Sequence, residues 1–366
     1  MINVFHIASN KTWTGAEEYA YSLTSRLKGD PDFYVEVVCR KNDTVLTHFR
    51  RLEVPISILP LKGITDLDSP MRFARLLRKG HNVVHVHTFH DAFAAVMARR
   101  LSENRNTRVV MTIHGIAKPK SNYIYRKLYR AIDHYVFVSQ LAHDVWVNSA
   151  HGFDPACATV VHDSVMPNPL ATPPINLRER MHVETGQALI LYHGRICPEK
   201  GLDVLVEAAA QLDRRAFRLA LIGEGKRKYV GQLKGLIVAR QLAQNVSLVG
   251  FQENIPGLIA QCDFGVLPSI EPEALGIANL EYMMQGKPHI SSNNGAQSEY
   301  VDDGKNALLI TPGNPHALAA AMRSLISDPD MRQRLGHQAK IDFDSHLGYD
   351  TFYGRITQIY RSLFEK

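Results

Sequence analysis

The sequence predicts an α/β protein made of two doubly wound, Rossmann-like domains that face each other across a cleft. Short apolar runs alternate with amphipathic helical stretches along the whole chain. The apolar runs do not alternate strictly with polar residues, which is typical of parallel strands covered on both faces by helices. A length of 366 residues is more than one ordinary core accommodates, so the chain divides into two domains.

The first domain is predicted to span residues 1–168 and to contain seven strands. The short apolar runs that indicate them are at residues 3–7, 34–39, 56–59, 83–87, 108–112, 135–138 and 159–162. Helical patterns lie between several of these runs, at residues 16–27, 69–79 and 91–101. This order of elements predicts a parallel sheet.

A linker and a second α/β domain follow. Residues 163–176 contain four prolines, which is typical of a linker. Predicted strands of the second domain, residues 169–345, are at 188–192, 218–222, 246–248, 264–268, 289–292 and 308–310. Its predicted helices are at residues 201–211, 229–240, 255–261, 278–285 and 315–327. The amphipathic stretch 349–364 predicts a C-terminal helix, within residues 346–366, that returns to pack on the first domain.

Composition indicates a cytoplasmic globular protein. The chain is 45% hydrophobic and 21% charged, and it has no run of eighteen apolar residues. The N-terminal residues read directly as a strand and lack the regions of a signal peptide. The four cysteines are scattered without CxxC spacing, which argues against a disulfide framework or a zinc site.

Positive charge is concentrated in the first half of the chain. Residues 1–170 contain 21 Lys and Arg against 15 Asp and Glu, which accounts for the whole net charge of +6. Five basic residues and three tyrosines occur together in the segment 118–130. Such a segment is either a solvated helix face or a surface for an anionic membrane. The charge alone is also compatible with nucleic acid, but no nucleic-acid-binding motif appears, so no nucleic-acid partner is expected.

Two carboxylates, Glu273 and Glu281, lie eight positions apart around a predicted loop-to-helix transition. Glu273 ends the loop, and Glu281 is expected two turns into the helix. The unpaired N–H groups at a helix start attract phosphate, and a carboxylate on each side would hold the hydroxyls of a sugar and a ribose. The alternative is a first-turn acid favoured by the helix dipole together with an ordinary surface acid.

Two cations, Arg195 and Lys200, lie in a loop between a strand and a helix. Paired cations at the carboxyl end of a strand are suited to a diphosphate leaving group, whose negative charge grows as its bond to a sugar breaks. An ordinary surface loop remains the alternative.

Glycines end several predicted strands. Gly223 and Gly225 let a backbone approach a ligand or simply close a tight turn, and they do not form a GxGxxG fingerprint. Phe251, after another strand, lies in a turn that offers backbone groups to a base. Gly15 leaves room for a phosphate or sugar at the first helix, with a plain turn as the alternative.

Histidines gather in the first domain, but a metal site is not expected. His85, His87 and His90 are close in sequence, and no Cys or acid cluster accompanies them. His114 follows another strand and is predicted to point into the cleft. It would orient a sugar hydroxyl or share a proton there, unless it is a structural histidine.

Taken in order, these segments resemble the retaining, nucleotide-sugar-dependent glycosyltransferases of family 4, which have the two-domain GT-B fold. The resemblance covers nearly the whole chain and is densest from residue 189 to 310. The matching segments are Gly15-Ala-Glu, Val84-His-Val-His, Thr112-Ile-His-Gly, Val138-Ser139, Gly194-Arg195 through Lys200-Gly201, Gly223-Glu-Gly225, Gly250-Phe251, Pro268-Ser269, Glu273-x7-Glu281-x4-Gly286-x-Pro288 and Gly295-x3-Glu299-x-Val301-x-Asp303-Gly304. Departures are Thr14, Ala274-Leu275 and Asp163-Ser164, where Gly, Gly-Phe and Asn-Gly are common in the family.

The resemblance implies a role for each matching position. Arg195 and Lys200 would grip the diphosphate, Glu281 the ribose hydroxyls and Glu273 the transferred sugar. The backbone of residues 274–277 would lie at the phosphates, His114 would face the sugar, and Gly15 would leave room for substrate. The implied substrate-binding positions are Gly15, Gly223, Gly225, Phe251, Ala274, Leu275, Gly276, Ile277 and Glu281.

The resemblance also implies the reaction. A hexose or N-acetylhexosamine would pass from a nucleotide-diphosphate sugar to a glycan or lipid-linked glycan of a bacterial cell-surface polysaccharide or lipopolysaccharide. A UDP-sugar is favoured as the donor, and a GDP-sugar is the alternative. No metal or other cofactor is expected, and Arg, Lys and helix dipoles would replace Mg²⁺. The first domain would bind the acceptor, at the inner face of the plasma membrane. A nucleotide-sugar epimerase of the same fold is the alternative enzyme.

Overall fold

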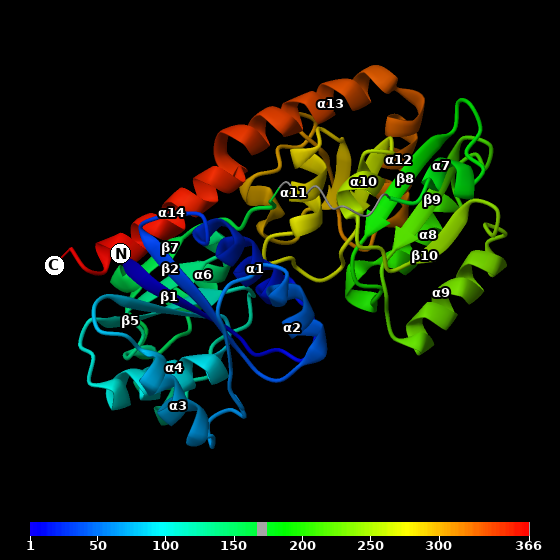
Figure 1. Cartoon of the computed structure of the whole chain (residues 1–366). Coiled ribbons are helices and arrows are strands. Elements are labelled where there is room, and N and C mark those ends of the chain that lie inside the picture. Colours follow the sequence, from blue (N-terminus) through cyan, green and yellow to red (C-terminus); the bar gives the residue numbers. More distant parts are fainter. Residues whose placement is uncertain (167–173, 366) are drawn as a thin grey trace. The chain divides into compact units, whose positions relative to one another are not determined.

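The computed structural model describes residues 1–166 and 174–365, so positions 167–173 of the predicted linker lie outside the described residues. The chain forms two compact units (Figure 1). The first unit contains Met1–Asp163 together with Asp350–Lys366, and the second contains Ser164–Tyr349. Within the part of the chain that the structure describes, no helix is both long and apolar enough to span a bilayer.

The first unit is built on a seven-stranded sheet in which every pairing is parallel. The strand order is β3-β2-β1-β4-β5-β6-β7, so the chain changes its direction of strand addition between β1 and β4. Ligands in such sheets bind beyond the carboxyl ends of the strands at this switch point. The strands are β1 (Ile2–Ala8), β2 (Phe33–Cys39), β3 (Ile56–Ile58), β4 (Asn82–Val86), β5 (Thr107–Ile113), β6 (His134–Phe137) and β7 (Ala158–Val160).

Helices cover both faces of this sheet, as the non-alternating apolar strands predict (Figure 1). Phe5 and Ile7 of β1 pack in one core cluster, with residues of helices α3, α4, α5 and α6. Ala8 packs in the opposite cluster, with residues of α1 and α2. The helices are α1 (Gly15–Leu27), α2 (Asp43–Arg50), α3 (Asp68–Leu76), α4 (Phe89–Ser102), α5 (Tyr123–Tyr129) and α6 (Gln140–Val147), with a 3₁₀ turn at Pro155–Cys157.

The C-terminal helix α14 (Tyr349–Ser362) belongs for most of its length to the first unit. The hydroxyl of Tyr360 lies 2.6 Å from Nδ1 of the buried His85, and the hydroxyl of Tyr353 donates to Asp30 at 2.7 Å. Arg361 forms an ion pair with Asp32. These contacts join the end of the chain to α1, its following turn and β4.

The second unit repeats the same winding with six parallel strands. Their order is β10-β9-β8-β11-β12-β13, so the switch point lies between β8 and β11. The strands are β8 (Ala188–His193), β9 (Phe217–Ile222), β10 (Val246–Gly250), β11 (Phe264–Leu267), β12 (His289–Ser292) and β13 (Leu308–Ile310).

The last two helices of the second unit, α12 and α13, begin at recognisable capping residues. Asn314 accepts from the N–H groups of two residues in the first turn of α12, and Asp328 does the same for one residue of α13. Proline follows at the first position of both helices, where its missing N–H costs nothing. The helices are α7 (Leu177–Arg180), α8 (Leu202–Ala209), α9 (Arg227–Ala239), α10 (Ile255–Ile259), α11 (Ile277–Met284), α12 (Pro315–Ser327) and α13 (Pro329–Asp342), with single turns at Pro198–Lys200, Ala296–Glu299 and Phe343–Leu347.

Candidate functional site

The loops that follow β8 and β11 meet at the switch point of the second sheet. Lys200 ends the loop after β8, and its ammonium group donates to the carboxylate of Glu273 in the loop after β11. The Ser269 hydroxyl donates to the same carboxylate oxygen. The fold therefore brings together a cation and a carboxylate that are 73 positions apart in sequence.

The backbones of these two loops also contact each other. The Ile270 N–H donates to the Glu199 carbonyl at 2.9 Å. A Cβ at Gly201, where φ is +64°, would lie 2.2 Å from the Pro268 carbonyl oxygen. A side chain at position 201 would therefore force the loops apart.

The helix start predicted after Glu273 is present. Gly276 precedes α11 in a left-handed conformation, with φ +87°, and within the described chain no side chain caps the first turn. Ala274, Leu275 and Gly276 form the turn that leads into the helix, and Ile277 is its first residue. The Tyr300 hydroxyl donates to the Leu275 carbonyl at 2.6 Å and so holds this turn in place.

Glu281 lies in the second turn of α11, closer to the helix start than the sequence pattern predicts. Nδ1 of His193, the last residue of β8, is 3.5 Å from Oε2 of Glu281. Burial lowers the pKa of His193 to about 3, with the nearby Lys200 charge as a further cause. The imidazole is therefore neutral at pH 7, and this contact is not an ion pair.

Arg195 lies in the same loop as Lys200, and its side chain is exposed. The Arg195 carbonyl accepts from the Tyr192 hydroxyl at 2.7 Å, which anchors the loop backbone to the end of β8. The second unit thus carries one paired and one exposed cation between β8 and α8.

Gly223 and Gly225 contact protein backbone rather than open space. A Cβ at Gly223 would lie 1.9 Å from the Gly194 carbonyl oxygen, and one at Gly225 would lie 1.9 Å from the Ile196 carbonyl oxygen. These glycines let the loop after β9 pack on the loop that holds Arg195. Their structural role is close packing of loops.

Phe251 follows β10 and has an exposed ring. It lines a cavity of about 290 Å³ whose described walls include no other predicted site residue. The cavity walls are Pro174, Ile175, Phe251, Gln252, Glu253, Asn254 and Leu258.

Three polar residues near the site were not predicted from the sequence: the buried His193 and Gln297, and the half-buried Tyr300. Both polar atoms of the Gln297 amide lack a partner in the described structure. A Cβ added at Gly295 would lie 2.4 Å from Oε1 of Gln297. The same Cβ would also lie 2.5 Å from the Glu273 backbone. The sequence signal that could have indicated Gln297 is its place inside the matched 295–304 segment.

In the first unit, Gly15 begins α1, and a Cβ there would meet nothing within 4 Å. The side chain of the preceding Thr14 does not cap the helix but donates to the carboxylate of Glu17. No described atom therefore crowds the Cα of Gly15, and its place at a substrate stays a prediction.

His114 follows β5 and lies beside a second histidine. Its Nε2 is 3.0 Å from Nδ1 of His87, so one of the two rings donates to the other. Burial lowers the pKa of His114 to about 4, and the ring is neutral at pH 7.

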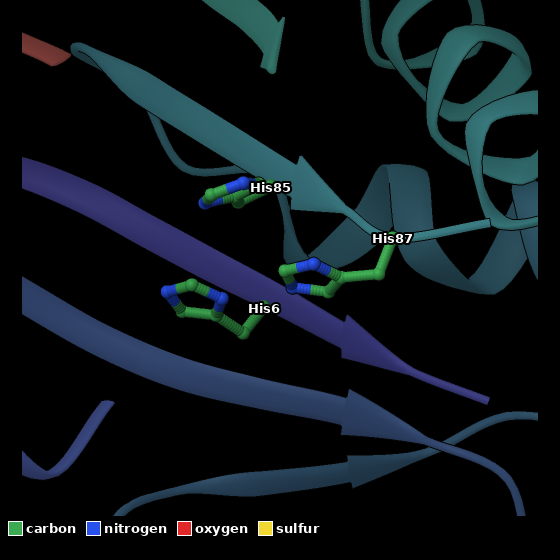
Figure 2. A group of neighbouring side chains, drawn as sticks. All are labelled: His6, His85 and His87. Atoms are coloured by element: carbon green, nitrogen blue, oxygen red, sulfur yellow. The ribbon is translucent and has the colours of Figure 1, made fainter. Parts of the chain in front are cut away.

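A buried group of three histidines, His6, His85 and His87, lies on one side of the first sheet (Figure 2). Their nearest ring nitrogens all lie within 4.8 Å of one another. Both His85 nitrogens are engaged, by the hydroxyls of Tyr360 and Thr112. The rings of His6 and His87 are stacked with an interplanar angle of 7°. Burial lowers the pKa of all three histidines, so the group consists of packed neutral rings at pH 7. That these histidines hold no metal stays a prediction.

Two family models match this chain and together account for most of it. The family described as "Glycosyltransferase Family 4" matches residues 13–167, and "Glycosyl transferases group 1" matches residues 175–342. The two matches correspond closely to the two units of the fold.

Curated relatives match parts of the chain. Alpha-D-kanosaminyltransferase from Streptomyces kanamyceticus is 34% identical over 167 residues, which is 44% of this chain and 42% of the relative. The putative glycosyltransferase EpsD from Bacillus subtilis is 26% identical over 276 residues, 71% of each chain. The chain spans about half the length of the first curated relatives it matches.

Solved structures share the fold over the full length. HepE from Anabaena in complex with UDP has a TM-score of 0.84 at 20% identity, covering 99% of this chain and 100% of that one. A glycosyltransferase from Rickettsia africae has a TM-score of 0.86 at 19% identity, covering 100% and 99%. At these identities the likeness concerns the fold alone.

Proposed function

The chain belongs to the family 4 glycosyltransferases of GT-B fold, and we propose that it transfers a hexose or N-acetylhexosamine from a nucleotide-diphosphate sugar to a glycan or glycolipid acceptor, with retention of configuration. The observation that carries the proposal is the Lys200–Glu273 pair beside the uncapped start of α11, with Glu281 one turn further on. A single small region thus offers a cation, helix N–H groups and two carboxylates. These are complementary to a diphosphate with a hydroxyl-bearing ring at each end.

We assign the diphosphate to Lys200, Arg195 and the turn of residues 274–277. As the bond to the sugar breaks, negative charge grows on the leaving phosphate, and the two cations with the N–H groups of α11 stabilise it. The Lys200 ammonium then exchanges its contact with Glu273 for the phosphate. The Glu273 carboxylate that is released accepts from a sugar hydroxyl.

Glu281 is assigned to the ribose. As a residue of a regular helix it is held rigidly, and two vicinal hydroxyls can donate to its two carboxylate oxygens. The neutral His193 beside it adds no competing charge. His114 belongs to the other unit, and its expected contact with the transferred sugar stays a prediction.

A UDP-sugar is the preferred donor. HepE is described in complexes with UDP and UDP-glucose, and Staphylococcus aureus TarM in a complex that includes UDP. A surface polysaccharide or lipopolysaccharide is the proposed product, since a relative from Rhizobium meliloti is a lipopolysaccharide core biosynthesis glycosyltransferase. The proposed mechanism uses no metal, because cations and helix N–H groups serve the diphosphate.

A peripheral contact with the anionic inner face of the plasma membrane accompanies the proposal. In α5 the side chains of Tyr123 and Ile124 are exposed, and the Lys127 ammonium lies over the Tyr123 ring. Tyr125 and Tyr129 are buried in the core, so the exposed apolar surface is smaller than three tyrosines would give. Cationic and apolar side chains on one short helix favour attachment at the membrane surface.

The test is a panel of UDP- and GDP-sugars in a thermal-shift assay, followed by transfer assays with the stabilising donor. Lys200→Ala and Glu281→Ala are expected to lose the donor-induced shift, whereas the exposed Lys234→Ala on α9 retains it. Unchanged sugar transfer by both site variants would refute the proposal. A donor-only reaction that yields an epimerised sugar nucleotide would identify an epimerase instead.

A further inference from the structure

A second candidate site lies entirely within the first unit. A cavity of about 360 Å³ opens at the carboxyl ends of β4 and β5, beside the first turns of α4 and α5. Its walls are His87, Thr88, Phe89, His90, Met111, Thr112, Ile113, His114, Gly115, Ala117, Lys120, Tyr125 and Trp146. The volume is at the small end of ligand pockets, sufficient for one ring and its substituents.

Three aromatic side chains make this cavity largely apolar. The rings of Phe89 and Trp146 stack with centroids 5.8 Å apart and an interplanar angle of 15°. The Phe89 and Tyr125 rings meet edge to face at 5.7 Å. Such walls favour a flat ring with an apolar face over a fully hydrated group.

Two nitrogen atoms of the wall residues have no hydrogen-bond partner in the described structure. They are Nε1 of Trp146, a residue that is 1% exposed, and Nε2 of His87. The indole N–H is a donor only, and an unpaired buried donor costs about 1–3 kcal/mol. The N–H is itself buried, so an oxygen atom of a ligand in this cavity would satisfy it only after the indole shifts toward the cavity that it lines.

The single formal charge among the described wall residues is positive. The Lys120 ammonium lies 5.1 Å from the centre of the Tyr125 ring and donates to the Tyr125 hydroxyl at 3.3 Å. Burial keeps His114 neutral, and no carboxylate faces the cation from the described walls. The cavity is therefore complementary to an acidic oxygen next to an apolar ring.

We propose that this cavity binds the acceptor, and that the acceptor carries an apolar ring-sized group beside a carboxylate or phosphate. The inference rests on the proposed function, because it takes the first unit to receive the acceptor. It deepens that function by assigning the acceptor class: an acidic, ring-bearing glycoside rather than a neutral sugar. Trp146 donates to an acceptor oxygen, and Lys120 pairs with the acidic group.

The test is calorimetric titration of the full chain, without donor, with glycosides that differ in one feature. Phenyl glucuronide carries both a phenyl ring and a carboxylate. Phenyl glucoside lacks the carboxylate, and methyl glucuronide lacks the phenyl ring. Phenyl glucoside 6-phosphate distinguishes phosphate from carboxylate. We expect the acidic phenyl glycosides to bind about tenfold more tightly than phenyl glucoside, because they form one charge-assisted hydrogen bond more. They should exceed methyl glucuronide by about as much, because the phenyl ring buries apolar surface in the cavity.

Two variants separate ligand binding from folding. Lys120→Met is expected to abolish the preference for the acidic glycosides, while Lys127→Met, outside the cavity wall, leaves it unchanged. Trp146→Phe is expected to weaken binding about fivefold, because it deletes the donor. It should also lower the Tm, because the smaller ring leaves a gap in a packed core, so its binding is measured at a temperature at which circular dichroism shows the variant folded. If Trp146→Phe does not fold, the Lys120→Met comparison decides alone.

The outcomes also distinguish this inference from the proposed function. Equal binding of all four glycosides, or no saturable binding while UDP still stabilises the protein, would overturn the acceptor class and leave the donor reaction intact. Absence of UDP stabilisation together with selective binding of the acidic phenyl glycosides would instead overturn the donor assignment.

Discussion

The Lys200 ammonium lies 2.5 Å from the Glu273 carboxylate, and the contact bridges the switch point of the second sheet. Only 17% and 16% of the two side chains is exposed, so each charge depends on the other for stabilisation. The two residues end loops that follow adjacent strands, which explains how positions so distant in sequence form one pair.

The first prediction concerns the stability of this pair. Lys200→Ala leaves a mostly buried carboxylate unpaired and is expected to lower the free energy of unfolding by about 2 kcal/mol. The double variant Lys200→Ala/Glu273→Gln removes both charges and should recover more than half of that loss. A double-mutant cycle from denaturant unfolding measures the coupling. Additive effects of the two substitutions would mean that the residues do not interact in solution.

The second prediction compares two glycines of the same unit. Gly223→Ala places a Cβ 1.9 Å from a backbone carbonyl at φ +137°, and we expect a loss of about 3 kcal/mol or more. Gly231→Ala, in α9 with no atom within 4 Å of its Cβ, should stabilise by about 0.5–1 kcal/mol. Chemical denaturation of both variants provides the comparison. A mild effect at position 223 would contradict the close packing of the loops after β8 and β9.

Most of the fold could be predicted because its signals are local. Buried parallel strands have continuous apolar runs, and the predicted strand at residues 289–292 and helix at 315–327 have the bounds that the structure shows. The amphipathic pattern failed for α13, which buries only Leu335, Gly336 and Ala339 among its 14 residues. Tertiary contacts define such a helix, and a single sequence does not show them.

The candidate site was predictable in its charges but not in its supporting contacts. Arg195, Lys200, Glu273 and Glu281 stand out because cations and acids flank a loop and a helix start. Tyr300 has no such signal, since its role depends on the distance between its hydroxyl and the Leu275 carbonyl. Loop packing accounts for Gly223 without any ligand, so its place in substrate binding stays a prediction.

The third prediction tests Tyr300 as a positioning residue for the turn before α11. Tyr300→Phe removes the hydrogen bond to the Leu275 carbonyl and should loosen the proposed phosphate-binding turn. We expect the KM for the donor to rise about fivefold, with a stability loss of about 1 kcal/mol. Transfer rates at several donor concentrations give the KM, and the Tm reports the change in stability. The same stability loss with an unchanged KM would assign Tyr300 a purely structural role.

The fourth prediction is an acid sensitivity of the first unit that arises from His6. Burial lowers the pKa of His6 to about 3, whereas an unfolded chain protonates its histidines near pH 6.5. Between these values the unfolded state binds more protons, so the free energy of unfolding falls as the pH falls. The loss approaches about 1.4 kcal/mol per pH unit for each such histidine.

His6→Phe keeps a ring in the stack with His85 and His87 and removes this titration. Its stability should decline less steeply from pH 6 to pH 4 than that of the unmodified protein. Both tryptophans, Trp13 and Trp146, belong to the first unit, so their fluorescence follows the unfolding of that unit in denaturant. His151→Phe, at an exposed position, is the matched control and should keep the original slope. The prediction fails if the free energy of unfolding declines with pH as steeply in His6→Phe as in the control. His6 would then take up its proton in the folded state as readily as in the unfolded chain, and burial would not hold it neutral.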